Sequence, residues 1–259
     1  MTLIVAIANQ KGGAAKTTST CGLGAALAER GKRILLCDLD PQGGLSDAFG
    51  VKGSGGELFG ALYRRESLDS LVVSASSGFA VIPNGPLMEG FVPAASTQEE
   101  RESFLKDSLK KSRVEDFDFI LLDCPPRLDL ISTNALTAAH TVLIPIILEA
   151  PSITPFATLL QQISVVQKKW NPGLSISGVV ACKVDFRDNQ TKEILTWLKS
   201  SRSDVYETVI RKNTRLSEAH NTKLPVTTYA PESSGAQNYR ALAEEFEARH
   251  TKQFQKAAN

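Results

Sequence analysis

Short apolar runs alternate along this chain with longer stretches of mixed polarity. The apolar runs cover residues 3–8, 33–38, 79–83, 118–123, 141–146 and 174–182, and their length and β-branched content are typical of buried strands. Residues 17–30, 96–113, 153–170, 189–200 and 234–254 have a helical pattern. Strands that alternate with helices indicate an α/β fold with a doubly wound, mostly parallel sheet flanked by helices. We therefore predict a single α/β domain over residues 1–259, with a short polar tail from about residue 252.

Three other stretches are less regular. Residues 83–95 are predicted to form a loop, and the capping signature that begins at Ser96 predicts that a helix starts there. Residues 205–210 could form a short strand, and residues 217–220 a helical turn.

The most informative stretch joins the first predicted strand to the first predicted helix. Its candidate ligand-binding residues are Lys11, Gly12, Gly13, Ala14, Ala15, Lys16, Thr17 and Thr18. Glycines let backbone N–H groups converge on an anion, and the start of a helix adds unpaired N–H donors and a positive dipole end. Lys16 can reach the β- and γ-phosphates of a nucleotide, and the Thr17 hydroxyl can ligate Mg²⁺. The alternative is a glycine turn with two surface lysines.

The general phosphate-loop pattern does not fit this stretch. That pattern has glycine six residues before the lysine and again directly before it, where this chain has Gln10 and Ala15. The stretch fits a variant pattern, Lys-Gly-Gly-x-x-Lys-Thr, which has a second lysine at the entrance of the loop.

Carboxylates follow two of the other predicted strands. Asp38 and Asp40 follow the second strand, and Asp123 ends the apolar strand that precedes Pro125. Open parallel sheets place ligands at the carboxyl ends of their strands, so these aspartates should lie near the loop. Asp123 is in the position of a Walker B aspartate, which binds Mg²⁺, commonly through water. The alternative is that these carboxylates merely end their strands.

The composition restricts the possible functions. Lysine and arginine number 29 against 28 acidic residues, so DNA binding would need a local basic patch such as Arg211, Lys212 and Arg215. An ordinary exposed loop is the alternative for that cluster. The four cysteines form no CxxC pair and three of them lie in or beside apolar runs, which favours reduced core residues in a cytosolic protein. No apolar run has the roughly 18 residues of a membrane span, and the N-terminal run is too short for a signal peptide.

The motifs together resemble the ParA/MinD family of ATPases. The resemblance includes the loop, Asp-x-Asp-Pro-Gln-Gly at residues 38–43, Asp-x-Pro-Pro at 123–126 and Asn-x-Arg-Leu-Ser-Glu-Ala at 213–219. It implies that Lys11 reaches the nucleotide of a dimer partner, that Asp40 positions the attacking water, and that Asp38 supports the Mg²⁺ shell, with Asp40 also a candidate metal residue. It further implies that Asn213 and the neighbourhood of Pro231 border the adenine. Arg187 and Arg215 are expected to bind DNA without sequence preference.

The family resemblance implies a Mg²⁺-dependent ATPase that works as a switch. ATP would assemble a homodimer that binds nucleoid DNA in the cytoplasm without sequence preference. A ParB-like adaptor or cargo protein would stimulate hydrolysis, so that a plasmid, chromosome or other cargo is partitioned or positioned.

Two alternatives have different requirements. A MinD-like positioning switch needs a basic amphipathic membrane anchor, but residues 239–250 are acidic in their middle. An electron-transfer ATPase like the nitrogenase iron protein needs paired cysteines for a cluster. Cys124 lies beside Asp123, but a second exposed cysteine is missing.

The chain departs from the family at several positions. Ala15 replaces a glycine, Arg211 replaces a proline, and Cys182-Lys183 occurs where Thr-Met is frequent. If Ala15 has φ > 0, its Cβ strains the backbone beside the phosphates or the dimer partner, and we expect slow basal hydrolysis. If φ is negative and a methyl-sized gap lies beside it, the substitution is neutral.

Overall fold

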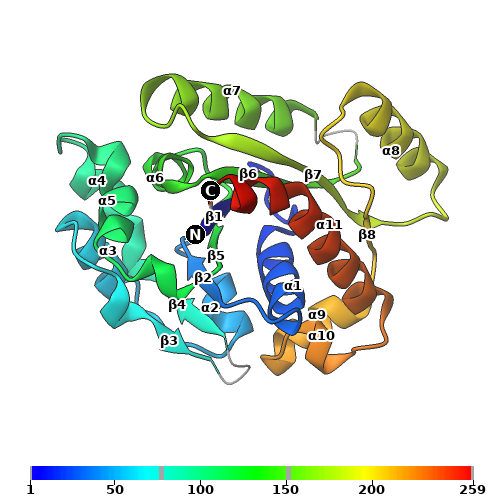
Figure 1. Cartoon of the computed structure of the whole chain (residues 1–259), viewed down its shortest axis with the longest axis horizontal. Helices are drawn as coiled ribbons and strands as arrows, with labels where there is room; N and C mark the ends of the chain where they lie inside the picture. The colour runs from blue at the N-terminus through cyan, green and yellow to red at the C-terminus, as the bar shows by residue number, and fades with distance from the viewer. Residues whose placement is uncertain (1, 76–78, 150–152, 258–259) are drawn as a thin grey trace.

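One sheet runs through the centre of the computed structural model (Figure 1), which describes residues 2–75, 79–149 and 153–257. The strands are β1 (Leu3–Ile7), β2 (Ile34–Asp38), β3 (Val73–Ser74), β4 (Ala80–Ile82), β5 (Phe119–Asp123), β6 (Thr141–Ile147), β7 (Ser175–Val184) and β8 (Ile210–Arg211). Their order across the sheet is β3-β4-β2-β5-β1-β6-β7-β8, and every pair except β3–β4 is parallel. The predicted fold class is therefore confirmed.

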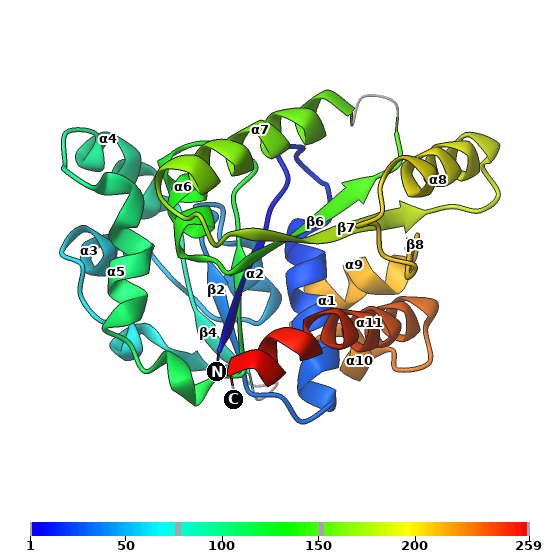
Figure 2. The ribbon, with the colours of Figure 1, turned by 45° about the horizontal axis from the view of Figure 1, so that its top comes forward.

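Helices cover both faces of the sheet, as Figure 2 shows. On one face lie α1 (Lys16–Glu29), α2 (Gly44–Ala48), α9 (Thr214–Thr222), α10 (Val226–Tyr229) and α11 (Ser234–Ala257). On the other lie α3 (Gly56–Tyr63), α4 (Phe91–Ala95), α5 (Phe104–Lys110), α6 (Leu130–Ala138), α7 (Ile153–Lys169) and α8 (Asn189–Ser201). Because successive strand residues point to opposite faces, Val5 and Ile7 pack under α1 whereas Ile4 and Ala6 pack under the second layer.

Short 3₁₀ turns connect some of these elements, at Asp69–Leu71, Pro86–Gly90, Arg101–Ser103 and Val114–Asp116. The closing helix was expected to end near residue 254 and extends to Ala257.

The predicted start of a helix at Ser96 is wrong, because α5 begins only at Phe104. Ser96 instead follows α4, a helix that lies within the stretch predicted as loop. The Ser96 hydroxyl donates to the Pro93 carbonyl at 2.7 Å. Glu100 has a left-handed backbone (φ 50°), which a continuous helix cannot accommodate. The rings of Phe91 and Phe104 are both buried and 5.5 Å apart, so packing between α4 and α5 determines where each helix lies.

The register of the central strands determines where the site forms. Asp123 of β5 is paired with Ile7 of β1 on one side and with Asp38 of β2 on the other. The loop after β1 and the two aspartates therefore lie at the same edge of the sheet.

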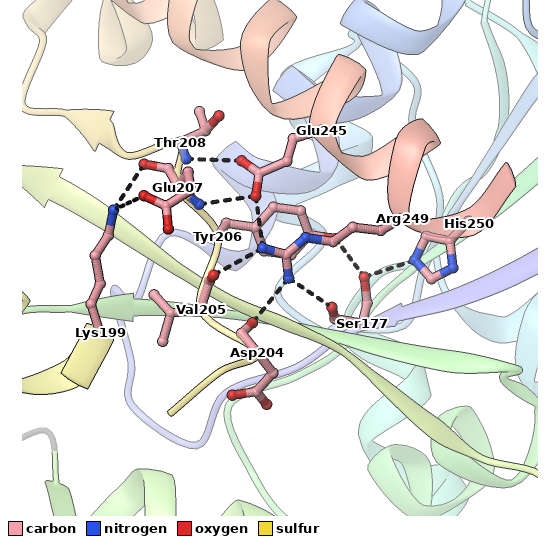
Figure 3. A network of polar contacts seen from close by, with 10 residues as sticks. All are labelled: Ser177, Lys199, Asp204, Val205, Tyr206, Glu207, Thr208, Glu245, Arg249 and His250. Carbon is pink, nitrogen blue, oxygen red and sulfur yellow. Dashed lines mark hydrogen bonds and ion pairs between the residues drawn. The ribbon is translucent and has the colours of Figure 1, made fainter. Parts of the chain in front are cut away.

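A polar network fixes α11 to β7 (Figure 3). The Arg249 guanidinium donates to the carbonyls of Asp204 and Val205 at 3.1 and 2.8 Å and pairs with Glu245 at 2.7 Å. It also lies 3.8 Å from the centroid of the Tyr206 ring. This one side chain thus joins the closing helix to the segment that precedes β8.

Ser177 extends the network into β7. Its Oγ lies 2.6 Å from the Tyr206 hydroxyl and 2.8 Å from His250 Nε2 (Figure 3). The next residue, Gly178, has φ 148°, and a Cβ there would stand 2.2 Å from the Asp204 carbonyl oxygen. Only glycine lets the two segments approach this closely.

We predict that Arg249→Met lowers the free energy of unfolding by about 2–3 kcal/mol, because charge-assisted hydrogen bonds to partly buried carbonyls are lost. The matched control is Arg33→Met, which breaks an exposed pair with Asp118 and should cause a much smaller loss of stability. Urea unfolding measures both values. Equal losses in the two variants would contradict the structural importance of the network.

Candidate functional site

The loop between β1 and α1 has two residues with left-handed backbone. Gly13 has φ 72° and Ala15 has φ 65°. Ala15 is the N-cap of α1, and its carbonyl accepts the N–H of Ser19 at 2.8 Å. Of the two conformations left open for Ala15, the structure has the one with φ > 0. A left-handed alanine costs on the order of 1 kcal/mol, so the rest of the fold must hold this conformation.

Lys16 is the first residue of α1, and it is 7% exposed. Burial lowers the pKa of its ammonium group, while the nearby charges of Asp123 and Asp40 act in the opposite direction. The first turn of a helix also has N–H groups without partners inside the helix. The loop and helix start therefore form a positively polarised site at the edge of the sheet.

Asp123 lies directly beside this helix start. The Thr17 hydroxyl donates to Asp123 Oδ2 at 2.7 Å, and the Thr20 hydroxyl donates to Oδ1 at 3.1 Å. Burial, and secondarily the charge of Asp38, raises the pKa of Asp123 to about 7. The structure thus brings Thr17 and Asp123, two of the candidate Mg²⁺ ligands, into direct contact.

Asp38 is also buried, but the protein already uses its oxygens. Oδ2 accepts the Ser46 N–H at 2.8 Å and the Ser46 hydroxyl at 2.6 Å, and Oδ1 accepts the Asp40 N–H at 3.1 Å. Burial raises the pKa of Asp38 to about 6, although the bonds from Ser46 oppose this shift. The contacts of Asp38 hold the loop that carries Asp40.

Asp40 itself is less buried than Asp38. Its Oδ1 accepts the Gln42 N–H at 3.0 Å, which leaves the second oxygen available for another donor. One Asp-x-Asp motif therefore supplies a structural carboxylate and a more accessible one.

The oxygen donors at this edge of the sheet are too few to hold a metal ion without further ligands. Across residues 2–75, 79–149 and 153–257, no group of three His, Cys, Asp or Glu side chains could hold a metal by itself. Mg²⁺ is usually held by one or two protein ligands together with phosphate oxygens and water. Thr17 and Asp123 fit that second arrangement.

Lys11 lies at the entrance of the loop and contacts the segment that follows β6. Its Nζ is 2.6 Å from Glu149 Oε2, just after β6. The backbone N–H of Lys11 donates to Asn9 Oδ1 at 3.0 Å. The entrance lysine is therefore paired within its own chain in this structure.

A pocket opens beside the loop, between α1 and the segment around β8. Its lining includes Ala15, Thr18, Lys183 and Asn213. Asn213 is held by two bonds, since Oδ1 accepts the Arg215 N–H at 2.8 Å and Nδ2 donates to Ser234 Oγ at 2.8 Å. Pro231 is exposed and does not belong to this lining; its carbonyl accepts a bond from Arg240 at 2.6 Å.

The structure brings three of the four predicted DNA-contacting residues to one edge of the sheet. Arg187 follows β7, while Arg211 and Lys212 lie at the end of β8, which pairs in parallel with β7. Arg211 lies over the ring of Phe186, 5.4 Å from its centroid.

Acidic partners offset part of this charge. Arg187 pairs with Asp185 at 2.7 Å, and Arg215 pairs with Glu218 at 2.6 Å. Because the Arg187 side chain is exposed, its ion pair with Asp185 is weak, and another anion can compete with Asp185 for the guanidinium.

Several residues that contact the loop or its aspartates were not predicted from the sequence. Thr20 lies one turn after Thr17 and so shares its helix face, a spacing that could have been recognised. Ser46, Glu149 and Lys183 come from other segments, and only the fold reveals their contacts.

Comparisons with known proteins agree with this geometry. Residues 2–176 match a family model described as an AAA domain. The sporulation initiation inhibitor protein Soj of Bacillus subtilis is 38% identical over 253 residues, covering 95% of this chain and 98% of Soj. The chromosome partitioning protein ParA of Myxococcus xanthus is 33% identical, covering 96% and 89%. The chain belongs to the ParA/MinD family of ATPases.

Solved structures show the same fold. Cobyrinic acid a,c-diamide synthase from Mycobacterium smegmatis, with bound ADP and magnesium, has a TM-score of 0.84 at 32% identity and covers 97% of this chain and 96% of its own. The cell division ATPase MinD of Pyrococcus furiosus has a TM-score of 0.77 at 28% identity, with 96% and 99% coverage. In the described part of this chain, no helix is long and apolar enough to cross a membrane.

Proposed function

We propose that this protein is a Mg²⁺-dependent ATPase that acts as a nucleotide-controlled switch in DNA partitioning or cargo positioning. One observation carries the proposal: the Thr17 hydroxyl lies 2.7 Å from the Asp123 carboxylate, directly after the buried Lys16. Lysine, hydroxyl and aspartate in this arrangement are the protein groups that phosphoryl transfer requires around a nucleotide. Relatives named chromosome partitioning proteins support the biological role.

Each residue of the site has a proposed task. The loop amides of residues 12–18 and the Lys16 ammonium bind the phosphates. Thr17 and Asp123 would hold Mg²⁺, which supplies positive charge to the phosphate oxygens when bound. Asp38 keeps the following loop in place, and Asp40 orients the attacking water. Asn213 borders the base.

The switch is proposed to depend on dimerisation. In the ATP state two copies associate, and Lys11 leaves Glu149 to contact the nucleotide of the partner. Arg187, Arg211, Lys212 and Arg215 then bind nucleoid DNA through its phosphates. A ParB-like adaptor or cargo protein stimulates hydrolysis and releases the dimer from DNA.

The MinD-like alternative would use the C-terminal helix as a membrane anchor. Tyr239, Leu242 and Phe246 of α11 are fully buried in the core that α11 shares with α1 and the sheet. The apolar face of this part of α11 is therefore already occupied, which favours the DNA-dependent switch over membrane attachment.

DNA binding measured with ATP, with ADP and without nucleotide tests this proposal. We expect tight binding only with ATP, a steep dependence on salt and little dependence on base sequence, because phosphates are contacted. Arg215→Glu should weaken DNA binding and leave ATP-driven dimerisation intact. Arg113→Glu, another exposed arginine, is the matched control. Equal binding in all three nucleotide states would refute the switch, and base-selective binding would refute phosphate contact.

A second prediction separates the two lysines of the loop. Lys16→Ala should abolish ATP binding, since the buried cation aimed at the β- and γ-phosphates is lost. Lys11→Ala should retain ATP binding but lose hydrolysis, because its task lies in the partner's site. Nucleotide titration and phosphate release measure the two steps separately. If both variants lose ATP affinity equally, the division of tasks is wrong.

A third prediction concerns the strained Ala15. Ala15→Gly relieves a left-handed alanine but enlarges the unfolded ensemble, two effects of about 1 kcal/mol or less that oppose each other. We expect unchanged ATP affinity and a higher basal turnover or a shifted monomer–dimer equilibrium, since the Cβ stands where two loops would face each other. Wild-type hydrolysis should be slow without a partner protein. Identical turnover and dimerisation in both proteins would show that Ala15 is neutral.

A further inference from the structure

A lysine with strained backbone lies one residue before the end of β7. Lys183 has φ 55°, a conformation that residues with a Cβ rarely adopt. The pairing of β7 with β8 shifts register at this residue, between the pairs Cys182↔Ile210 and Val184↔Arg211. Such a bulge re-aims a side chain: Lys183 is exposed, while Cys182 and Val184 are buried.

The re-aimed side chain contacts the phosphate loop. Lys183 Nζ donates to the Gly13 carbonyl oxygen at 3.1 Å, across 170 residues of sequence. The same lysine lines both the pocket that contains Ala15 and Asn213 and a second pocket that contains Glu149. Its ammonium therefore lies at the junction of the loop with the surrounding site.

The tip of the loop has little other packing. Gly12 and Gly13 are exposed, and a Cβ built on either one would meet no atom within 4 Å. A charge-assisted hydrogen bond to a backbone carbonyl at such a place restrains the loop more than it would inside a packed segment.

We propose that Lys183 is a positioning residue of the phosphate site, which holds the loop tip in a nucleotide-accepting conformation before the nucleotide binds. This inference rests on the proposed function, because it assigns a task within that site. Preorganisation reduces the ordering cost of binding. Since the restraint acts on the part of the loop that would contact both ADP and ATP, its loss weakens the binding of the two nucleotides equally.

Three variants isolate the restraint. Lys183→Met removes the ammonium and keeps the length, Lys183→Arg restores a cation, and Lys183→Gly removes the side chain together with the backbone strain. Lys223→Met is the matched control, because Lys223 has the same left-handed backbone (φ 59°) and an ion pair of its own, with Asp47 at 2.7 Å.

Hydrogen exchange of the peptide covering residues 8–16, without nucleotide, measures the protection of the loop directly. Titration with fluorescent ADP and ATP analogues measures the two dissociation constants. We expect Lys183→Met to speed exchange and to raise both dissociation constants by about 3–10-fold, the usual net effect of one hydrogen bond at an exposed position. Lys183→Arg should restore both, and Lys223→Met should change neither. Lys183→Gly should show the same loss of loop protection with an unchanged or higher melting temperature, which a merely structural role would not produce.

Two results would overturn the inference. Unchanged exchange in Lys183→Met would show that the bond does not restrain the loop. A loss of affinity for ATP alone would show that Lys183 contacts the γ-phosphate instead of positioning the loop. If the wild-type protein binds neither nucleotide, the proposed function fails, whereas the exchange comparison still decides the restraint.

Discussion

The burial of the Asp123 carboxylate constrains every other part of the site. A charged group enclosed at the edge of a sheet is stable only if donors and positive charge surround it. Thr17 and Thr20 supply the donors and Lys16 supplies the charge, and all three belong to the first turns of α1. The start of α1 is thereby fixed against β5, and the connecting loop from β1 must adopt the left-handed turn at Ala15 to reach it.

The same physics separates the two aspartates that follow β2. Asp38 is buried beside Asp123, and its charge adds to the burial that raises the pKa of the Asp123 carboxyl. Three hydrogen bonds, two of them from Ser46, stabilise the charged form of Asp38 and at the same time fix the turn. The turn then carries Asp40 to a more accessible position. Carboxylates two residues apart in sequence thus have environments suited to different tasks.

Sequence alone predicts those parts of the structure that depend on local pattern. The apolar strands and the residues that end them, Asp38 and Asp123, follow from runs of neighbouring residues. The start of α5 could not be predicted, because the packing of Phe91 against Phe104 overrides the capping signature at Ser96. The contact from Lys183 to the loop depends on a bulge between two strands, which no local pattern encodes.

Two residues with strained backbone connect the fold to the phosphate loop. A left-handed residue with a Cβ persists only where its surroundings hold it in place. At Glu100 and Lys223 the strain serves a turn and a helix end. Ala15 and Lys183 are different, because both act on the phosphate loop: Ala15 joins the loop to α1, and Lys183 donates to the Gly13 carbonyl from β7. The bonds of Asp123 hold the first residue and the bulge between β7 and β8 holds the second. The loop is therefore restrained at its tip by Lys183 and at its C-terminal end by Ala15, and its exposed glycines need no packing of their own.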